Sequence, residues 1–319
     1  MYHYSVIQWL FFFYFYSFCG WCIESAYVSV RMKKLTNRGF MRGPFLPLYG
    51  SGALMMLVVS MPFQDNVVKT YLAGCAGATV LEYITGVTME TLFKVRYWDY
   101  SDKKFNFQGH ICLGTTISWG FLTILMTEIV HVPIEKMMLA FPSQILTIVT
   151  IIVTVVIVSD FVLAFKTAID LRNVLVKMEK AREEMVHIQK RLDVIIALAN
   201  AEWENRKEEW TEGITAKKDA FTEGMSVRIE DLKTGIESKL TSIKNMAQSK
   251  PSRYLESVRE EIAELKTKYT SNVETKDRMS GIRNFFQRAM IRSNPSMTSD
   301  KYKESLEELQ HNARDNNKK

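Results

Sequence analysis

Two cysteines and one glutamate in the stretch SFCGWCIES are the first residues of the chain whose types and spacing could do chemistry. Cys19 and Cys22 have the Cys-x-x-Cys spacing of a thiol–disulfide centre, which normally lies at a helix N-terminus in a βαβ unit. Here the preceding residues are apolar and aromatic, and from Tyr4 to Val30 the only fully ionised side chain is Glu24. We therefore interpret the cysteines as packing residues of a membrane helix, and Glu24 as the residue whose role needs explaining.

Two further glutamates, Glu82 and Glu90, lie in another apolar stretch and share a four-residue spacing with small residues. This spacing predicts one slowly drifting helix face that holds Gly74, Ala78 and Gly86 as well. In the first apolar stretch, Gly20 and Glu24 have the same four-residue spacing between a small residue and an acid. An acid facing lipid at the membrane centre costs about 2.5–3.5 kcal/mol, so we expect these carboxylates to face the interior of a helix bundle.

The sequence thus predicts a polar site within the membrane, in the half of the bundle nearest the basic loops. Its expected members are Glu24, Glu82, Glu90, Arg42, Arg96 and Asp99. Two interpretations stay open. The acids and bases either pair to hold helices together, or they form a site for an ion, a proton or a lipid headgroup. No Cys/His cluster with the spacing of a metal site is present, so no metal and no cofactor is expected.

The charged residues divide the chain into two different halves. Residues 1–165 contain 20 Asp, Glu, Lys and Arg residues, whereas residues 166–319 contain 56. The fold class expected is an all-α integral membrane protein with five transmembrane helices and a long helical or coiled-coil cytoplasmic region. The five spans are predicted at 4–30, 45–62, 67–92, 110–131 and 144–165. The net charge of +6 suits an acidic membrane surface, and no nucleic-acid partner is expected.

The loops predict how the spans are oriented in a plasma membrane. Loops 31–43 and 93–109 and the segment after 165 carry several Lys and Arg residues, whereas loops 63–66 and 132–143 carry almost none. Under the positive-inside rule the N-terminus is expected outside and the C-terminus in the cytoplasm.

The loop NRGFMRGPFLPLYGSG, residues 37–52, is unusual for a simple connector. Its glycines allow close backbone approach, and Pro44 and Pro47 cannot sit inside a regular helix. One interpretation is a broken or re-entrant start of the second span, because irregular backbone at membrane depth must be buried in protein or line a polar cavity. The other is an ordinary helix that begins with proline in its first turn.

The soluble part is expected to comprise a long helix over 166–248 and a second segment over 249–319. An eleven-residue repeat places Gly213, Gly224 and Gly235 in register, and it predicts a narrow apolar stripe for helix–helix pairing, including self-association, or for lying on a membrane. In 249–319 we expect a second helix, which folds back as a hairpin or pairs elsewhere, and a tail. Between these, the basic amphipathic segment RMSGIRNFFQRAMIRSNP could touch the inner leaflet or pack on the arm.

Several motifs occur in an order that resembles a bacterial family, the putative ABC-transporter type IV permeases. They are YSFCGWCIES, NRGFMRGPFLPLYGSG, LEYITGVTMETLF, YWDYSD, FNFQGHICL and SWG, within residues 8–200. The resemblance implies, besides Glu24, Glu82, Glu90 and Asp99, a set of motif residues. These are Gly20, Trp21, Asn37, Arg38, Gly39, Gly43, Pro44, Pro47, Tyr49, Gly50, Trp98, Tyr100, Gly109 and Cys112.

The resemblance implies transport, with membrane lipids and a separate ATPase subunit as partners. The chain has no G-x-x-x-x-G-K-[ST] motif, so it is not expected to hydrolyse ATP by a P-loop. Two alternatives stay open: a membrane-embedded lipid-modifying enzyme or lipid carrier, and a non-catalytic membrane scaffold with a coiled-coil arm. No catalytic residue is predicted. A cavity open to the inner leaflet would favour an enzyme or carrier, and a fully packed glutamate cluster would favour a scaffold.

Overall fold

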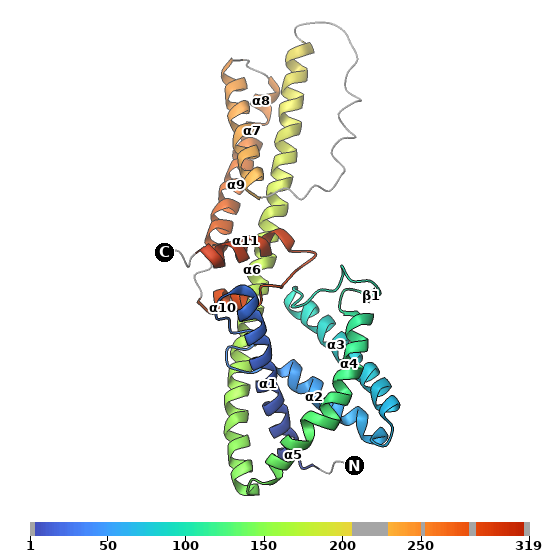
Figure 1. The fold of residues 1–319 in the computed structure, drawn as a ribbon. Coiled ribbons are helices and arrows are strands. Elements are labelled where there is room, and N and C mark those ends of the chain that lie inside the picture. Colours follow the sequence, from blue (N-terminus) through green and yellow to red (C-terminus); the bar gives the residue numbers. More distant parts are fainter. Residues whose placement is uncertain (1–3, 206–228, 250–252, 281–284, 316–319) are drawn as a thin grey trace. The chain divides into compact units, whose positions relative to one another are not determined.

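The computed structural model describes residues 4–205, 229–249, 253–280 and 285–315 (Figure 1). These residues form two compact units. Unit 1 comprises residues 1–173, 283–303 and 313–319, and unit 2 comprises residues 174–282 and 304–312.

Unit 1 is built almost entirely from helices. In chain order they are α1 (Val6–Met32), α2 (Pro47–Ser60), the 3-10 turn η1 (Met61–Phe63), α3 (Val67–Phe93), α4 (Leu113–Ile124), the π-helical turn η2 (Leu125–Val130), α5 (His131–Leu139) and the first half of α6 (Ser143–Asn205). A two-residue antiparallel pair, β1 (Asn106–Phe107) and β2 (Ile111–Cys112), closes the loop after α3. α10 (Phe285–Ser293) also belongs to this unit.

Four helical stretches of the described residues are long and apolar enough to cross a membrane. They are Val6–Met32, Val67–Phe93, Leu113–Leu139 and Ser143–Ala201. The expected second span is different, because α2 has only 14 residues before η1. At 1.5 Å per residue α2 is ~21 Å long, short of the ~30 Å hydrocarbon core. The chain is a helical membrane protein, but the expected count of five full spans is not confirmed.

Local capping explains where the long helices begin and end. α1 begins at Ser5, whose side chain caps Gln8 in a reciprocal capping box, and α3 begins at Asn66, which caps Lys69. Both helices end at a lysine in the left-handed conformation, Lys33 (φ 51°) and Lys94 (φ 62°). A left-handed residue stops a helix abruptly, so the basic loops begin directly at these two ends.

The chain after α1 turns back and runs down along the same helix. The amide of Thr36 donates to Ser29 Oγ (2.9 Å), that of Arg38 to Ser25 Oγ (3.1 Å), and that of Leu46 to the Ser17 carbonyl (3.0 Å). Ser17 lies fifteen residues before the end of α1, ~22 Å along the helix. α2 therefore begins deep in the unit, after an irregular segment that α1 holds by hydrogen bonds.

Both interpretations of residues 37–52 describe part of this arrangement. Pro47 is at the first turn of α2, as in an ordinary proline-initiated helix. The irregular backbone before it nevertheless lies beside the middle of α1, where Leu46 N donates to the Ser17 carbonyl, as expected of a broken span.

Close packing at small residues joins α3 to α4 and α1 to α2. Four residues of the predicted α3 stripe are buried, and Glu90 is not among them. The four are Gly74, Ala78, Glu82 and Gly86. A side chain at Gly74 would overlap Thr123 of α4, and one at Gly20 would overlap the ring of Tyr49. The small residues thus let neighbouring helices approach, as their spacing predicts.

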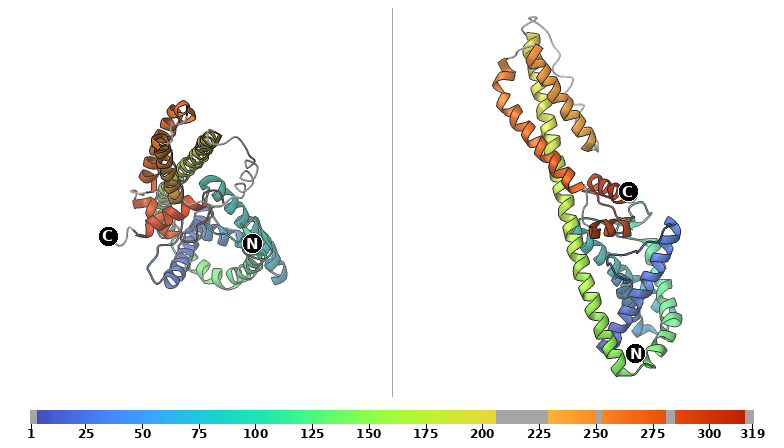
Figure 2. Two further views of the ribbon diagram at one scale, coloured as in Figure 1. Left: turned by 90° about the horizontal axis from the view of Figure 1, so that it is seen from above. Right: turned by 90° about the vertical axis from the view of Figure 1, so that its left-hand side faces the viewer.

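Unit 2 contains the second half of α6, α7 (Ile229–Ser249), α8 (Arg253–Ser257), α9 (Arg259–Ser280) and most of α11 (Lys303–Asp315). α6 runs unbroken from unit 1 into unit 2 (Figure 2). Its residues share one core with α7 and α9, made of Met185, Ile188, Leu192, Ile195, Leu232, Ile236, Leu265 and Tyr269 among others. Within this unit α9 therefore packs on α6 and α7. Gly213, Gly224 and most of the repeat lie outside the described residues; Gly235 lies in α7.

Candidate functional site

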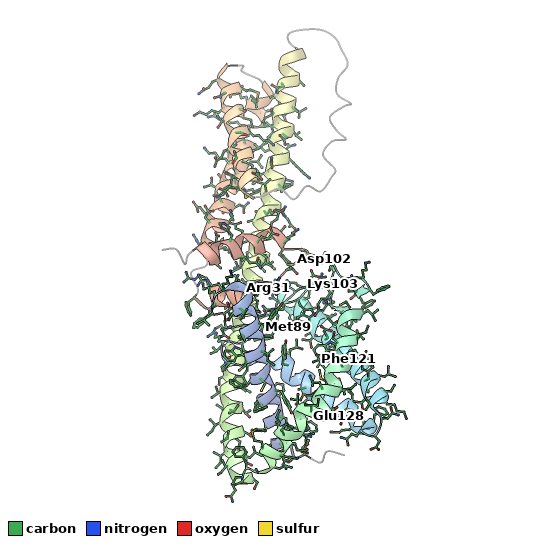
Figure 3. All side chains as sticks on the ribbon, in the orientation of Figure 1. Arg31, Met89, Asp102, Lys103, Phe121 and Glu128 are labelled. Carbon is green, nitrogen blue, oxygen red and sulfur yellow. The ribbon has the colours of Figure 1, made fainter. Side chains whose placement is uncertain are left out.

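A cavity of about 700 Å³ lies among α1, α2, α3 and α4 in unit 1. Its wall is mostly apolar; among the residues that line it are Met56, Leu81, Met89, Leu122, Phe161 and Phe165. Met89, which is labelled in Figure 3, belongs to the last turns of α3. The polar side chains on the wall include Glu24, Arg38, Tyr49, Glu82 and Tyr100. Two of the three predicted glutamates therefore border one cavity.

Glu24 is bound by one tyrosine and lies near one arginine. Tyr49 Oη donates to Glu24 Oε1 at 2.5 Å, and Arg38 Nε lies 3.9 Å from Glu24 Oε2. Tyr49 comes from the first turn of α2, so the irregular segment before α2 brings it to this position. The side chain of Glu24 remains 30% exposed, so it is not fully enclosed by these two partners.

Neutral hydrogen-bond donors surround Glu82. Tyr100 Oη donates to Glu82 Oε1 at 3.1 Å, and Trp119 Nε1 donates to Oε2 at 2.9 Å. Glu82 is only 6% exposed. Ion pairs of the described residues do not include this glutamate, which is held instead by hydrogen bonds from α4 and from the loop after α3.

Glu90 belongs to a different, charge-balanced cluster. Its Oε2 accepts from Arg96 Nε at 2.9 Å and lies 3.1 Å from His110 Nε2. Arg96 also contacts Asp300 (2.9 Å) and Asp99 (3.8 Å). Glu90 and His110 border a separate cavity of about 390 Å³. The three glutamates do not meet at one point, and Glu90, Arg96 and Asp99 form a network with the C-terminal segment.

Arg42 does not reach the glutamates. Its Nη2 donates to Thr167 Oγ1 at 2.8 Å, and its guanidinium lies over the ring of Phe286, 3.6 Å from the centroid. The cation near Glu24 is Arg38, which the sequence analysis treated only as a motif residue. The aromatic partner of Arg42 comes from α10, so this helix packs within unit 1, although Phe285 is 65% exposed.

Asp160 of α6 is a functional candidate that sequence reasoning did not single out. Its Oδ2 accepts from the backbone amides of Arg42 (3.1 Å) and Gly43 (2.8 Å). A side chain at Gly43 would lie 3.1 Å from the same oxygen, which explains the glycine. A single acid within an otherwise apolar helix was the signal that could have found it.

Residues 293–298, at and after the end of α10, contact the loops that follow α1 and α3 in unit 1. Arg38 donates to the Ser293 carbonyl, to Asn294 Oδ1 and to Ser296 Oγ, each at 3.1 Å. The backbone of Thr298 pairs with that of Arg96 in both directions, at 2.8 and 2.9 Å. Asn294 is 2% exposed and borders the 700 Å³ cavity. Asn294, from a distant part of the sequence, therefore forms part of the cavity wall.

The remaining motif residues shape the loops. Trp21 Nε1 donates to Asn37 Oδ1 (2.6 Å), and Asn37 Nδ2 donates to the Arg42 carbonyl (2.6 Å). Trp98 Nε1 donates to the His110 carbonyl (3.0 Å). Gly39 (φ 138°) and Gly109 (φ 71°) adopt conformations that other residues rarely adopt. Pro44 lies in the irregular segment before α2.

Loop groups outside the membrane spans have shifted pKa values with clear causes. Burial lowers the pKa of Arg38, an effect that Glu24 opposes. Burial, with Glu82 adding to it, raises the pKa of Tyr100, so this tyrosine stays a proton donor to Glu82. Burial alone would raise the pKa of Asp99, but hydrogen bonds from Ser101 and Thr298 and the charge of Arg96 lower it overall.

Cys19 and Cys22 are both free in the structure; Cys22 is exposed, and Cys19 borders the cavity. Among the residues that the structure describes, His, Cys, Asp and Glu do not gather in threes that could hold a metal ion.

The long apolar helices indicate a helical membrane protein, and unit 1 holds a mostly apolar cavity with two carboxylates on its wall. Residues 11–165 match the model of a protein family described as "Putative ABC-transporter type IV". The resemblance seen in the motifs is therefore confirmed over the membrane-embedded part of the chain. Comparisons with curated proteins and with solved structures gave no match.

Proposed function

We propose that unit 1 is the membrane component of a transporter that binds an amphipathic molecule with a cationic headgroup. The cavity that Glu24 and Glu82 border carries this proposal. Its volume of about 700 Å³ lies within the range of small-molecule sites, and its apolar wall suits a hydrocarbon body. A fully packed glutamate cluster would instead have favoured a scaffold.

The charges on the cavity wall favour a ligand whose headgroup is positively charged. Two carboxylates border the cavity, and the basic side chain there is Arg38, which lies 3.9 Å from Glu24 and also binds the C-terminal segment. Glu82 has only neutral donors around it. A bound ammonium group would compensate the second carboxylate, since a carboxylate removed from water is stabilised by a nearby opposite charge.

The alternative of a lipid-modifying enzyme uses the same cavity. The described residues on its wall include no histidine, and the hydrogen bonds found among them do not join Ser51, Thr85 or Thr88 to Glu24 or Glu82. The wall therefore supports binding better than catalysis. ATP hydrolysis would come from a separate P-loop subunit, and the family match supports such a partner. The helices of unit 2 are the proposed surface for self-association.

The topology that we propose has five membrane segments, with α2 as a broken fifth segment inside the bundle. In Figure 3, Arg31, Asp102 and Lys103 lie at one end of unit 1 and Glu128 lies toward the other, so both basic loops share an end. That end is assigned to the cytoplasm by the positive-inside rule. Reporter fusions after Ala140 and Lys319 should report opposite sides, with Lys319 inside; the same side for both would contradict the topology.

Photolabelling tests the ligand proposal. A dodecylammonium probe with a diazirine on its alkyl chain, added to the full-length protein in lipid nanodiscs, should label residues of the cavity wall. Glu82→Gln should lower this labelling about tenfold, because a neutral amide does not attract an ammonium ion. Glu90→Gln is the matched control, since Glu90 lies outside this cavity and should leave labelling unchanged.

A dodecyl sulfate probe with the same chain should label the wall much less than the ammonium probe. Equal labelling by both probes, or equal labelling of wild type and Glu82→Gln, would refute a cationic ligand. A P-loop ATPase that copurifies with the tagged chain would support the transport role, and its reproducible absence from crosslinked membranes would count against it.

A further inference from the structure

A chain of hydrogen bonds links the end of unit 1 near the start of α1 to the cavity. Tyr4 Oη donates to Glu135 Oε1 and lies 3.0 Å from His131 Nε2. On the other side of the ring, Tyr16 Oη lies 2.7 Å from His131 Nδ1. Tyr16 is one of the residues that border the cavity. Four side chains thus connect a half-buried carboxylate with the cavity interior.

The directions of these hydrogen bonds determine which ring nitrogen of His131 carries a proton. Because Tyr4 donates its proton to Glu135, His131 Nε2 must be the donor to Tyr4. Nδ1 of a neutral ring then accepts from Tyr16, whereas Nδ1 of a protonated ring donates to it. His131 is 0% exposed, so it exchanges protons through hydrogen-bonded neighbours, of which Tyr4 and Tyr16 are two.

The backbone places His131 through a feature that is rare in helices. The six residues Leu125–Val130 form a π-helical turn, and the amide of His131 donates to the Met126 carbonyl, five residues back. Such turns rotate the following side chains relative to an α-helix and occur often at functional sites. Around the ring lie Phe12 and Tyr4, with ring centroids at 4.8 and 5.9 Å. Titratable groups facing His131 include Tyr4, Tyr16 and Glu135.

We propose that Tyr16, His131, Tyr4 and Glu135 form a proton path between the cavity and the end of unit 1 near the start of α1, and that the cavity continues this path to Glu24 and Glu82. Tyr16 passes its hydroxyl proton to His131 Nδ1 as it accepts a proton from the cavity, and Nε2 releases its own proton to Tyr4. Tyr4 passes its hydroxyl proton to Glu135, which then releases the proton. Each group ends with its original number of protons once the hydroxyl groups and the ring tautomer have reset, so no co-reactant is needed.

The second part of the path follows α1. Glu24 lies eight residues after Tyr16, which is ~12 Å along the helix, and the cavity borders both residues. Glu24 and Glu82 provide carboxylates that can accept the proton toward the end of the basic loops. The ligand of the cavity would then share its site with protons, which is the requirement for coupling ligand movement to a proton gradient. The inference uses the cavity but does not depend on its occupant.

Proton flux without any ligand tests this path. The full-length protein is reconstituted into phosphatidylcholine–phosphatidylglycerol vesicles that enclose a pH-sensitive dye, and a potassium gradient with valinomycin drives proton entry. Wild type should acidify the vesicles at least ten times faster than protein-free vesicles. His131→Phe should return the rate to the protein-free level.

Tyr16→Phe keeps the ring and removes one hydroxyl group, so it tests the path even if His131→Phe fails to fold. Its matched control is Tyr14→Phe, on the same helix, because the Tyr14 hydroxyl donates to Thr154 (2.8 Å) and lies outside the chain. Tyr14→Phe should conduct as wild type does, and Tyr16→Phe should not. Wild-type flux equal to that of protein-free vesicles, or equal flux in the two tyrosine variants, would overturn the proton path, whatever the photolabelling of the ammonium probe shows.

Discussion

Arg38 and Asn294 are 256 residues apart in the sequence, yet Arg38 Nη1 donates to Asn294 Oδ1 at 3.1 Å beside the cavity. The same arginine lies 3.9 Å from Glu24, and Asn294 Nδ2 donates to the Gly39 carbonyl at 3.0 Å. One guanidinium thus joins the C-terminal segment, the loop before α2 and the acid in α1. A ligand that attracts Glu24 would compete directly with this connection.

Replacing Arg38 by alanine should release the C-terminal segment. Three hydrogen bonds from Arg38 to Ser293, Asn294 and Ser296 are lost, and the free energy of unfolding should fall by ~2 kcal/mol, because bonds to charged groups contribute about 1.5–3 kcal/mol each before relaxation. Thermal unfolding in detergent measures the loss, and limited proteolysis should cut within 285–303 sooner. Arg31→Ala, at an exposed residue in the last turn of α1, is the control. A stable Arg38→Ala variant with an uncut segment would contradict this assignment.

Two glycines of α2 offer a matched pair for testing how closely α2 approaches α1. A methyl group at Gly50 would overlap Ser17 Oγ and the Phe13 carbonyl, whereas one at Gly52 meets no atom within 4 Å. Gly50→Ala should therefore lower the free energy of unfolding by ~1–3 kcal/mol through overpacking. Gly52→Ala should be neutral or slightly stabilising, since alanine favours the helix. Equal thermal stabilities of the two variants would show that α2 is less tightly seated than the hydrogen bond from Leu46 to Ser17 implies.

The pH dependence of the loop after α3 follows from Asp99. Its pKa is lowered in the folded protein, so its contribution to stability is fully present above the unfolded pKa, near 3.8, and is lost as the pH falls below that value. Amide hydrogen exchange of residues 94–112 should therefore accelerate between about pH 4 and pH 3 in wild type. Asp99→Asn should exchange faster at pH 7 and lose this pH-dependent step. An unchanged step in the variant would assign it to another acid.

The four-residue spacing in α3 shows how far the sequence could predict the site. Each step of four residues advances 400° around the helix and so drifts by about 40°. Glu82 remains on the buried stripe, but two further steps turn Glu90 by about 80°, toward His110 and Arg96. The spacing therefore predicted the buried face that holds Glu82, and the drift explains why Glu90 belongs to another cluster.

The partners of these acids could not be predicted in the same way. Whether Arg38 or Arg42 approaches Glu24 depends on an irregular backbone between residues 33 and 46, which has no period to extrapolate. The bonds from Arg38 to residues 293–296 and from Arg96 to Thr298 join segments about 200 or more residues apart, and one sequence carries no local signal for them. The helices could be predicted because hydrophobic periodicity is a local pattern. The loop contacts could not, because they depend on residues far apart in the sequence.

Residues 19–25, CGWCIES, contain two cysteines and Glu24, and replacing the cysteines should have a very different effect from replacing Glu24. Cys19 and Cys22 are free, and Cys22 is exposed on the helix surface, so replacing both by alanine should leave ammonium photolabelling and proton flux within about twofold of wild type. Glu24→Gln should reduce both strongly while the protein still accumulates in the membrane. Glutamine keeps the size of the side chain and can still accept from Tyr49, so its loss of function would identify the negative charge as the requirement. Circular dichroism and membrane yield control for folding. If the cysteine-free variant is inactive and the Glu24→Gln variant is active, the cysteines and not Glu24 are required for function, and a thiol reaction must be considered.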